Sequence, residues 1–250
     1  MGTIPVGLQL YCVRADCARD LPGTLAAVAK MGYDGVEFAG YHGYSAADLR
    51  RMLDDTGLKC CGTHLRLDAL QGDELQRTIE FNRVLGNRFL IVAWLEHDHD
   101  TPRSRWLEYA QAFAEAAARA AEQGFVVGYH NHFDEFKVVE GETPWDTFFG
   151  NTDPRVIMQM DTGNCLHGGG DPVAILKQYP GRAVTVHLKE WDGSWNRKII
   201  GEGVTNWPEL FAACESAGAT EWYIVEQENE NLAPLECVRR CRENLRKMGK

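Results

Sequence analysis

The sequence predicts an α/β protein whose strands close into a (β/α)8 barrel. Short apolar runs alternate with longer amphipathic stretches along the chain, which is the pattern of strand–helix units around a parallel sheet. Eight such units fit within 250 residues, the usual length of one barrel. We therefore expect one domain over residues 1–250, with an open doubly wound sheet as the alternative.

Each expected strand is a short apolar run bounded by turn-forming residues. The runs are Val6–Tyr11, Gly35–Phe38, Lys59–His64, Phe89–Trp94, Phe125–His130, Val156–Asp161, Val184–Lys189 and Trp222–Glu226. In a parallel barrel the carboxyl ends of such strands converge on one face, where enzymes of this architecture keep their chemistry.

Helices are predicted between the strands by apolar stripes and by residues that cap helix ends. The predicted helices are Leu21–Met31, Ser45–Thr56, Asp73–Leu85, Thr101–Gln123, Pro144–Phe149, Asp171–Gln178, Asn206–Ala217 and Pro234–Met248. Glycine, which commonly ends helices, directly follows seven of them. The glycine-rich run 162–171 is expected to be a flexible, close-packed turn, because it lacks the GxGxxG and Walker patterns of phosphate-binding loops.

The composition argues against several classes of function. The net charge of −10 and the pI near 5.3 oppose sequence-independent binding to nucleic acid. No apolar run approaches the roughly 18–20 residues of a membrane span, and the first residues do not resemble a signal peptide. The eight cysteines contain no CxxC pair, so we expect reduced, mostly buried thiols in a cytoplasmic protein.

Four of the expected strands end in a side chain that can bind a metal ion. These side chains are His130, Asp161, His187 and Glu226, each separated from the next by about one strand–helix unit. Imidazole and carboxylate groups together suit a divalent first-row metal. Because the strand ends converge, we predict a catalytic site for one divalent cation, with Mn favoured over Co, Fe, Zn and Mg.

Several runs of sequence, spread from end to end, carry a specific resemblance. They are VGLQLY at 6–11, MGYDGVEF at 31–38, GYHNHFDEF at 128–136, QMDTGN at 159–164, VHLKE at 186–190, GEG at 201–203 and YIVE at 223–226. Together they resemble the sugar phosphate isomerase/epimerase superfamily of xylose isomerase-like TIM barrels. The His-Asn-His run also resembles the keto-glycoside lyases and inosose dehydratases of that superfamily.

The resemblance implies one divalent cation held by Glu, Asp, His and Glu at the ends of strands five to eight. Asp161, His187 and Glu226 match the last three of these ligands. His130 stands where many relatives have the first glutamate, and His132, which has the same strand parity, is the rival ligand.

The resemblance also implies a reaction, namely isomerisation or epimerisation of a sugar or keto-sugar by proton abstraction next to a carbonyl, through an enediolate. In epimerase relatives two ligand glutamates serve as the bases, but only Glu226 remains here. Glu135 is therefore predicted to reach back from its loop as a second base. The alternative is a lyase or hydratase that eliminates a β-substituent or water with one base.

Two further alternatives are weaker. The superfamily includes AP endonucleases, but the acidic charge and the single set of ligands argue against DNA as substrate. A non-catalytic sugar-binding barrel would leave the four aligned ligands without a purpose. We expect a small carbohydrate substrate and no nucleic-acid or membrane partner; a homo-oligomer stays open.

Other side chains are expected to face the substrate. Glu37 and His64 end earlier strands, and His132 follows His130. Lys189 lies two residues beyond His187, on the same side of its strand, where a cation can stabilise a developing enolate. The candidates for an apolar wall are Phe38, Trp94, Trp191 and Trp195. The histidines at 97 and 99 are assigned to a solvated acidic loop, because no strand fixes their geometry.

Overall fold

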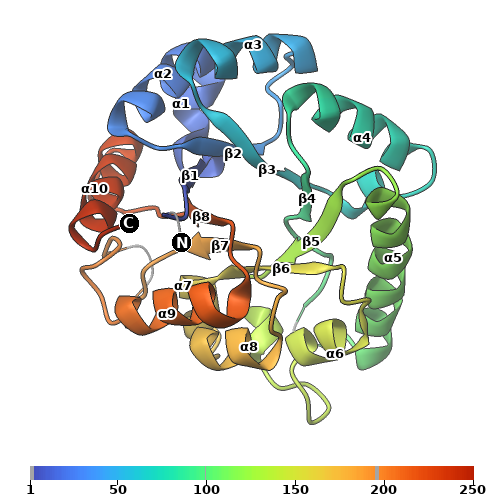
Figure 1. Ribbon diagram of the computed structural model, residues 1–250. Coiled ribbons are helices and arrows are strands. Elements are labelled where there is room, and N and C mark those ends of the chain that lie inside the picture. The colour runs from blue at the N-terminus through green and yellow to red at the C-terminus, as the bar shows by residue number, and fades with distance from the viewer. Residues whose placement is uncertain (1–2, 99, 195–196) are drawn as a thin grey trace.

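The computed structural model describes residues 3–98, 100–194 and 197–250, and its strands form a closed parallel barrel in chain order (Figure 1). The strands are β1 (Val6–Gln9), β2 (Gly35–Ala39), β3 (Lys59–Leu65), β4 (Phe89–Val92), β5 (Val126–His130), β6 (Ile157–Asp161), β7 (Thr185–Leu188) and β8 (Trp222–Val225). β8 pairs with β1 and closes the ring. The predicted (β/α)8 barrel is confirmed, and the open sheet is excluded.

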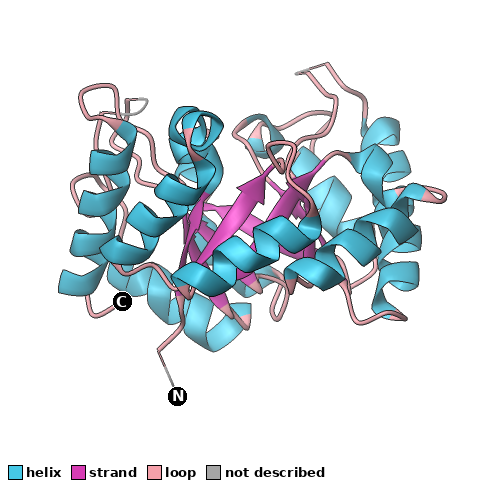
Figure 2. Cartoon of the chain, turned by 90° about the horizontal axis from the view of Figure 1, so that it is seen from above, coloured by secondary structure: helices cyan, strands magenta, loops and turns pink. Residues whose placement is uncertain are grey.

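Helices surround the barrel and leave its strands in the centre (Figure 2). The α-helices are α1 (Arg14–Arg19), α2 (Leu21–Met31), α3 (Ala46–Thr56), α4 (Glu74–Leu85), α5 (Arg103–Ala121), α6 (Pro144–Asn151), α7 (Thr162–His167), α8 (Pro172–Gln178), α9 (Trp207–Ala213) and α10 (Pro234–Lys247). Short 3-10 turns are η1 (Leu10–Val13), η2 (Leu67–Leu70) and η3 (Asp134–Phe136), and a π-helical turn, η4 (Cys214–Gly218), follows α9.

Helix ends are stabilised by local capping residues, of which the sequence predicted Ser45 and Gly32. The Asp20 side chain accepts a hydrogen bond from the Gly23 amide at the start of α2, and the Ser45 hydroxyl accepts one from the Asp48 amide at the start of α3. α2 ends at Gly32, whose φ of 81° is readily adopted only by glycine.

Two predictions about the backbone were wrong. The first strand ends at Gln9, because its side-chain oxygen accepts a hydrogen bond from the Tyr11 amide and starts η1. The glycine-rich run after β6 begins with α7 instead of a flexible turn. That helix forms because the Asp161 carboxylate caps it by accepting a hydrogen bond from the Asn164 amide at 2.7 Å.

The interior of the barrel, away from the carboxyl ends of the strands, is closely packed. A Cβ atom added at Gly7 would lie 2.5 Å from Cys61 Sγ, and one added at Gly128 would lie 2.6 Å from Ile157 Cγ1. These glycines thus admit neighbouring side chains into a packed core, which leaves the strand carboxyl ends as the place for polar groups. Among the described residues, no helix is long and apolar enough to cross a membrane. All eight cysteines are described, free and buried, as predicted.

Candidate metal centre

The four predicted metal ligands meet at the carboxyl ends of β5, β6, β7 and β8. His130, Asp161, His187 and Glu226 each offer one ligand atom, and these atoms all lie within 4.8 Å of one another. Asp161 and His187 are direct partners across the β6–β7 ladder. His187 Nδ1 lies 2.8 Å from Glu226 Oε2, and His130 Nε2 lies 3.9 Å from the same oxygen.

Asp161 carries the clearest sign that this cluster fits a cation. Its Oδ1 atom accepts the hydrogen bond that caps α7, whereas Oδ2 is buried and has no hydrogen-bond partner among the described residues. Burial raises the pKa of Asp161 to about 7. A buried carboxylate oxygen without a partner costs free energy that a bound cation would offset. The donor set therefore fits one divalent cation.

Asparagine side chains hold Asp161 in place. Asn131 accepts a hydrogen bond from the Asp161 amide at 2.8 Å and donates one to the Asp161 carbonyl at 3.2 Å. Asn164 donates to the Asn131 carbonyl at 3.1 Å. These bonds tie the end of β5 to the end of β6, so the backbone of one ligand is fixed by the loop that follows another.

His187 is held between two carboxylates. Its Nδ1 faces Glu226, and its Nε2 lies 2.6 Å from Glu37 Oε2. Burial would lower the pKa of His187, but the two carboxylates raise it to about 10. With Nε2 engaged by Glu37, Nδ1 is the nitrogen that can serve a cation, as in other carboxylate–histidine–metal arrangements.

Glu37 lies beneath the cluster and is not open to substrate. It has no exposed surface, and it accepts hydrogen bonds from Gln9 and Gln159 at 2.7 Å each in addition to its contact with His187. Burial would raise the pKa of Glu37, but His64 and His187 hold it well below its usual range. A Cβ atom at position 62 would lie 2.2 Å from Glu37 Oε1, so Gly62 makes room for this carboxylate.

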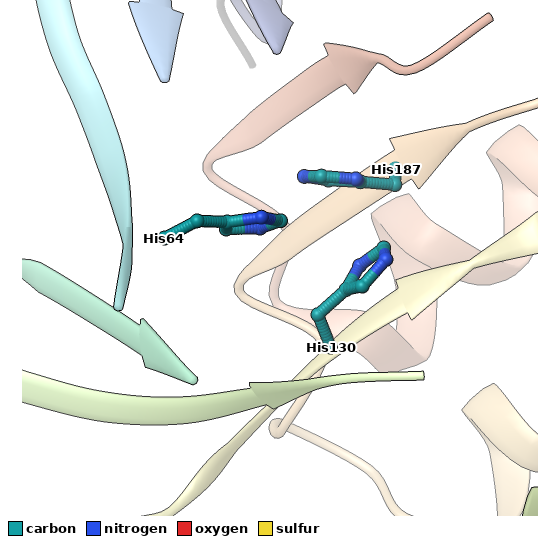
Figure 3. Close-up of side chains that lie close together, drawn as sticks. All are labelled: His64, His130 and His187. Carbon is teal, nitrogen blue, oxygen red and sulfur yellow. The ribbon is translucent and has the colours of Figure 1, made fainter. Parts of the chain in front are cut away.

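His64 brings a third imidazole to the cluster. Figure 3 shows the rings of His64, His130 and His187 turned toward one another, with centroids 4.6–5.2 Å apart. These three histidines also form a second group whose nitrogen atoms lie within reach of one ion. His64 Nε2 lies 2.6 Å from Gln159 Oε1 and 3.2 Å from Glu37 Oε2.

Lys189 stands beside the carboxylates, as predicted from its strand parity. It is 5% exposed, and its Nζ lies 3.5 Å from Glu226 Oε1. Burial would lower the pKa of Lys189, but Asp161 and Glu226 raise it, so the ammonium form is retained. A Cβ atom at Gly163 would lie 2.8 Å from Lys189 Cγ. Gly163, which follows Asp161-Thr162, thus makes room for the lysine that directly follows β7.

The structure does not bring Glu135 into this cluster. Glu135 is fully buried and accepts hydrogen bonds from the Tyr129 hydroxyl at 2.6 Å and from the His132 amide at 3.0 Å. His132 lies beside the cluster, with its ring centroid 5.2 Å from that of His130, and burial lowers its pKa. Of the two histidines, His130 is the one that belongs to the cluster.

The predicted aromatic wall is divided among different environments. Phe38 has no exposed surface and is a core residue, so its assignment to a wall was wrong. Trp191 stacks on His167 with centroids 4.4 Å apart, and Trp94 is 51% exposed at the end of β4. Trp195 and His99, for which the sequence also predicted roles, lie outside the described residues. His97 is not solvated as expected: its side chain is 4% exposed and its Nδ1 lies 2.8 Å from the Leu95 carbonyl oxygen.

Comparison with known proteins agrees with the barrel fold. The family model for the xylose isomerase-like TIM barrel matches residues 25–248. The rhizopine catabolism protein MocC of Rhizobium meliloti is 27% identical over an alignment of 263 positions, which covers 90% of this chain and 80% of that protein. An inosose dehydratase of Geobacillus kaustophilus is 27% identical over an alignment of 262 positions, which covers 84% of each.

Solved structures share the fold. A sugar phosphate isomerase/epimerase from Parabacteroides distasonis superposes with a TM-score of 0.85 at 24% identity, covering 98% of this chain and 94% of that one. At this identity the likeness speaks for the fold alone. The match to the family model extends over most of the sequence, and the chain therefore belongs to the xylose isomerase-like TIM barrel family.

Proposed function

We propose that this protein is a divalent-metal-dependent enzyme that removes the proton next to the carbonyl group of a sugar or cyclitol ketone. The proposal rests on the buried cluster of His130, Asp161, His187 and Glu226 with its unpartnered Asp161 oxygen. A divalent cation at this position would supply Lewis-acid polarisation of the carbonyl. The names of the relatives, inosose dehydratase among them, support a substrate of this chemical class.

Glu226 is our candidate for the base. Burial would raise its pKa, but the neighbouring His130, Lys189 and His187 hold the pKa well below the usual range, so the carboxylate is ionised at neutral pH. Lys189, 3.5 Å from this carboxylate, carries the positive charge that stabilises the oxygen on which negative charge develops. Glu226 would thus accept the proton while the charge of Lys189 stabilises the enolate.

The surroundings of Glu135 favour elimination over epimerisation. Epimerisation needs a second base on the opposite face of the substrate, and Glu135 was our candidate for it. Both Glu135 oxygens instead accept hydrogen bonds, from Tyr129 and from the His132 amide. We therefore propose that proton transfer to Glu226 is followed by cleavage of a β carbon–oxygen bond, with the leaving oxygen taking up the proton that Glu226 removed. This is the reaction of a lyase or dehydratase.

Isomerisation stays the second candidate, because it also needs only one base. Glu226 could return its proton to the neighbouring carbon of the same enediolate while a proton moves between the two enediolate oxygens, so that no carbon–oxygen single bond breaks. The structural likeness to proteins named sugar phosphate isomerase/epimerase is compatible with this outcome.

The test is NMR in D2O with a panel of ketoses, inososes and 3-keto-glucosides, with Mn²⁺ and with a chelator. Metal-dependent deuterium incorporation next to the carbonyl would support proton abstraction. A dehydrated product or a free aglycone would identify a lyase, whereas a product of the same composition as the substrate would identify an isomerase. Exchange that the chelator leaves unchanged would refute the metal-dependent mechanism.

A further inference from the structure

A pocket of about 340 Å³ lies on the strand-end face, to one side of the metal centre. It is lined by the segments 65–68 and 93–96, which follow β3 and β4, and by two residues of α5, Arg105 and Tyr109. Its volume is near the lower end of the roughly 300–1,000 Å³ that small-molecule sites occupy. The pocket is therefore large enough for one small ring and too small for a long chain.

One direct connection places this pocket next to the candidate centre. His64, whose ring contacts those of His130 and His187, directly precedes the lining residue Leu65. On the other wall, the Trp94 ring lies 6.0 Å from the ring of His97. His97 Nε2 in turn lies 4.0 Å from Glu135 Oε1. A ligand in the pocket would therefore lie next to His64, which contacts two of the candidate metal ligands, and on its other side near Glu135, which lies outside the cluster.

The lining suits a ring with an apolar face and many hydroxyl groups. Trp94, a large aromatic side chain, is 51% exposed in this concave site, and such exposure commonly marks a binding surface. Leu95 beside it is buried, and Tyr109 is fixed by donating its hydroxyl to the Glu96 carbonyl at 2.7 Å. The aromatic wall is therefore held by ordered neighbours.

The charges at the rim are balanced, which disfavours a phosphate group. Arg66 Nε lies 3.5 Å from Asp68 Oδ2, and Arg105 is paired with Glu108 at 2.7 Å. Glu96 adds a further acidic side chain. The pocket thus surrounds an aromatic face with donors and acceptors but carries no excess of positive charge, a combination that suits a neutral pyranose ring.

We propose that this pocket binds the second sugar ring of a two-ring substrate, whose first ring reacts at the metal centre. The inference rests on the proposed function and narrows the substrate to a glycoside. Trp94 would be the main contact for the apolar face of the second ring.

Binding can be tested without activity, by NMR saturation transfer and titration of the protein with a chelator present. The probes are maltose, cellobiose and trehalose against glucose. We expect at least one disaccharide to bind about tenfold more tightly than glucose, which corresponds to about 1.4 kcal/mol. Trp94→Ala should remove this difference, and Trp94→Phe should retain most of it. The matched control is Tyr44→Ala, which removes another exposed aromatic side chain outside the pocket.

Three results would overturn the proposal. They are equal binding of glucose and all three disaccharides, a preference that survives Trp94→Ala, and binding of p-nitrophenyl glucoside without binding of any disaccharide, which would assign the pocket to an aryl group. Failure of the proposed function would look different. In that case the disaccharide preference would persist without a metal, while no keto-sugar showed metal-dependent exchange.

Discussion

The two halves of the barrel contribute different things to the candidate site. The carboxyl ends of strands β5–β8 each supply one of the four candidate ligands. Asp161 has a carboxylate oxygen without a hydrogen-bond partner in the described part of the chain, and the side chain of Glu226 is partly exposed. Strands β1 and β2 supply Gln9 and Glu37, which are fully buried and hydrogen-bonded to each other. The first half of the barrel, through Glu37, orients the candidate ligand His187 of the second half.

The contrast shows how ligands differ from the groups that orient them. A metal ligand must leave a lone pair for the cation, so in the metal-free fold it looks like a poorly satisfied polar group. An orienting residue works in the opposite way. Glu37 engages Gln9, Gln159 and His187 at once, and this saturation fixes the nitrogen that His187 turns toward the centre.

The largest effect should come from the reacting half. Glu226→Gln keeps the shape of the side chain but removes the proposed base, so kcat should fall by about 10²–10⁴-fold at saturating metal. The control is Glu228→Gln, which removes a carboxylate at the rim that pairs with Arg14 at 2.6 Å. Steady-state kinetics on the substrate found in the exchange assay would measure both. Full activity of Glu226→Gln would remove this residue from the mechanism.

Proton competition should make metal affinity strongly dependent on pH. The folded-state pKa of Asp161 is raised from 3.8 to about 7, so the metal-free fold loses stability from this group as pH rises through that range. The pKa of His187 is raised from 6.5 to about 10, so its stabilisation is complete below 6.5 and is lost toward 10.

A cation must displace both protons below pH 7 and only the His187 proton above it. The apparent affinity should therefore rise by up to about a hundredfold per pH unit below pH 7 and by about tenfold above it. Calorimetric titration with Mn²⁺ between pH 5.5 and 8.5 would measure the two slopes. An affinity independent of pH would show that neither proton is released.

Removing the charge of the orienting carboxylate should have a moderate effect. Glu37→Gln retains one acceptor oxygen toward His187 but loses the negative charge, and loss of such an orienting partner typically lowers metal affinity by about 10–100-fold. Glu202→Gln, on a carboxylate paired with Arg240 at 2.7 Å, is the matched control. If Glu37→Gln lowered kcat while metal affinity stayed constant, the first half of the barrel would take part in the chemistry itself.

The sequence predicted which candidate ligands cluster better than it predicted the residues that support them, for a physical reason. Each candidate ligand stands at the end of an apolar strand, and the barrel brings all strand ends to one face. The position of a residue along its own strand was therefore sufficient to predict that it would lie at the site. The roles of Gln159 and Asn131 depend on contacts with other strands, which no single segment reveals. Glu135 was misplaced because it lies in a loop, where strand parity does not set the direction of the side chain. Its contacts with Tyr129 and His132 appear only in the folded chain.

The smallest expected effect is a steric test of how tightly the supporting half is packed. In Gly62→Ala the added Cβ would lie 2.2 Å from Glu37 Oε1, so the carboxylate must move, and overpacking of this kind costs about 1–3 kcal/mol of stability. In Gly150→Ala, the control, the added Cβ meets nothing within 4 Å in a helix, where alanine is favoured over glycine by about 0.5–1 kcal/mol. Urea unfolding with a chelator present would measure both variants. If Gly62→Ala were as stable as the parent protein but bound Mn²⁺ more weakly, Glu37 could shift freely, and its position would matter for the metal and not for the fold.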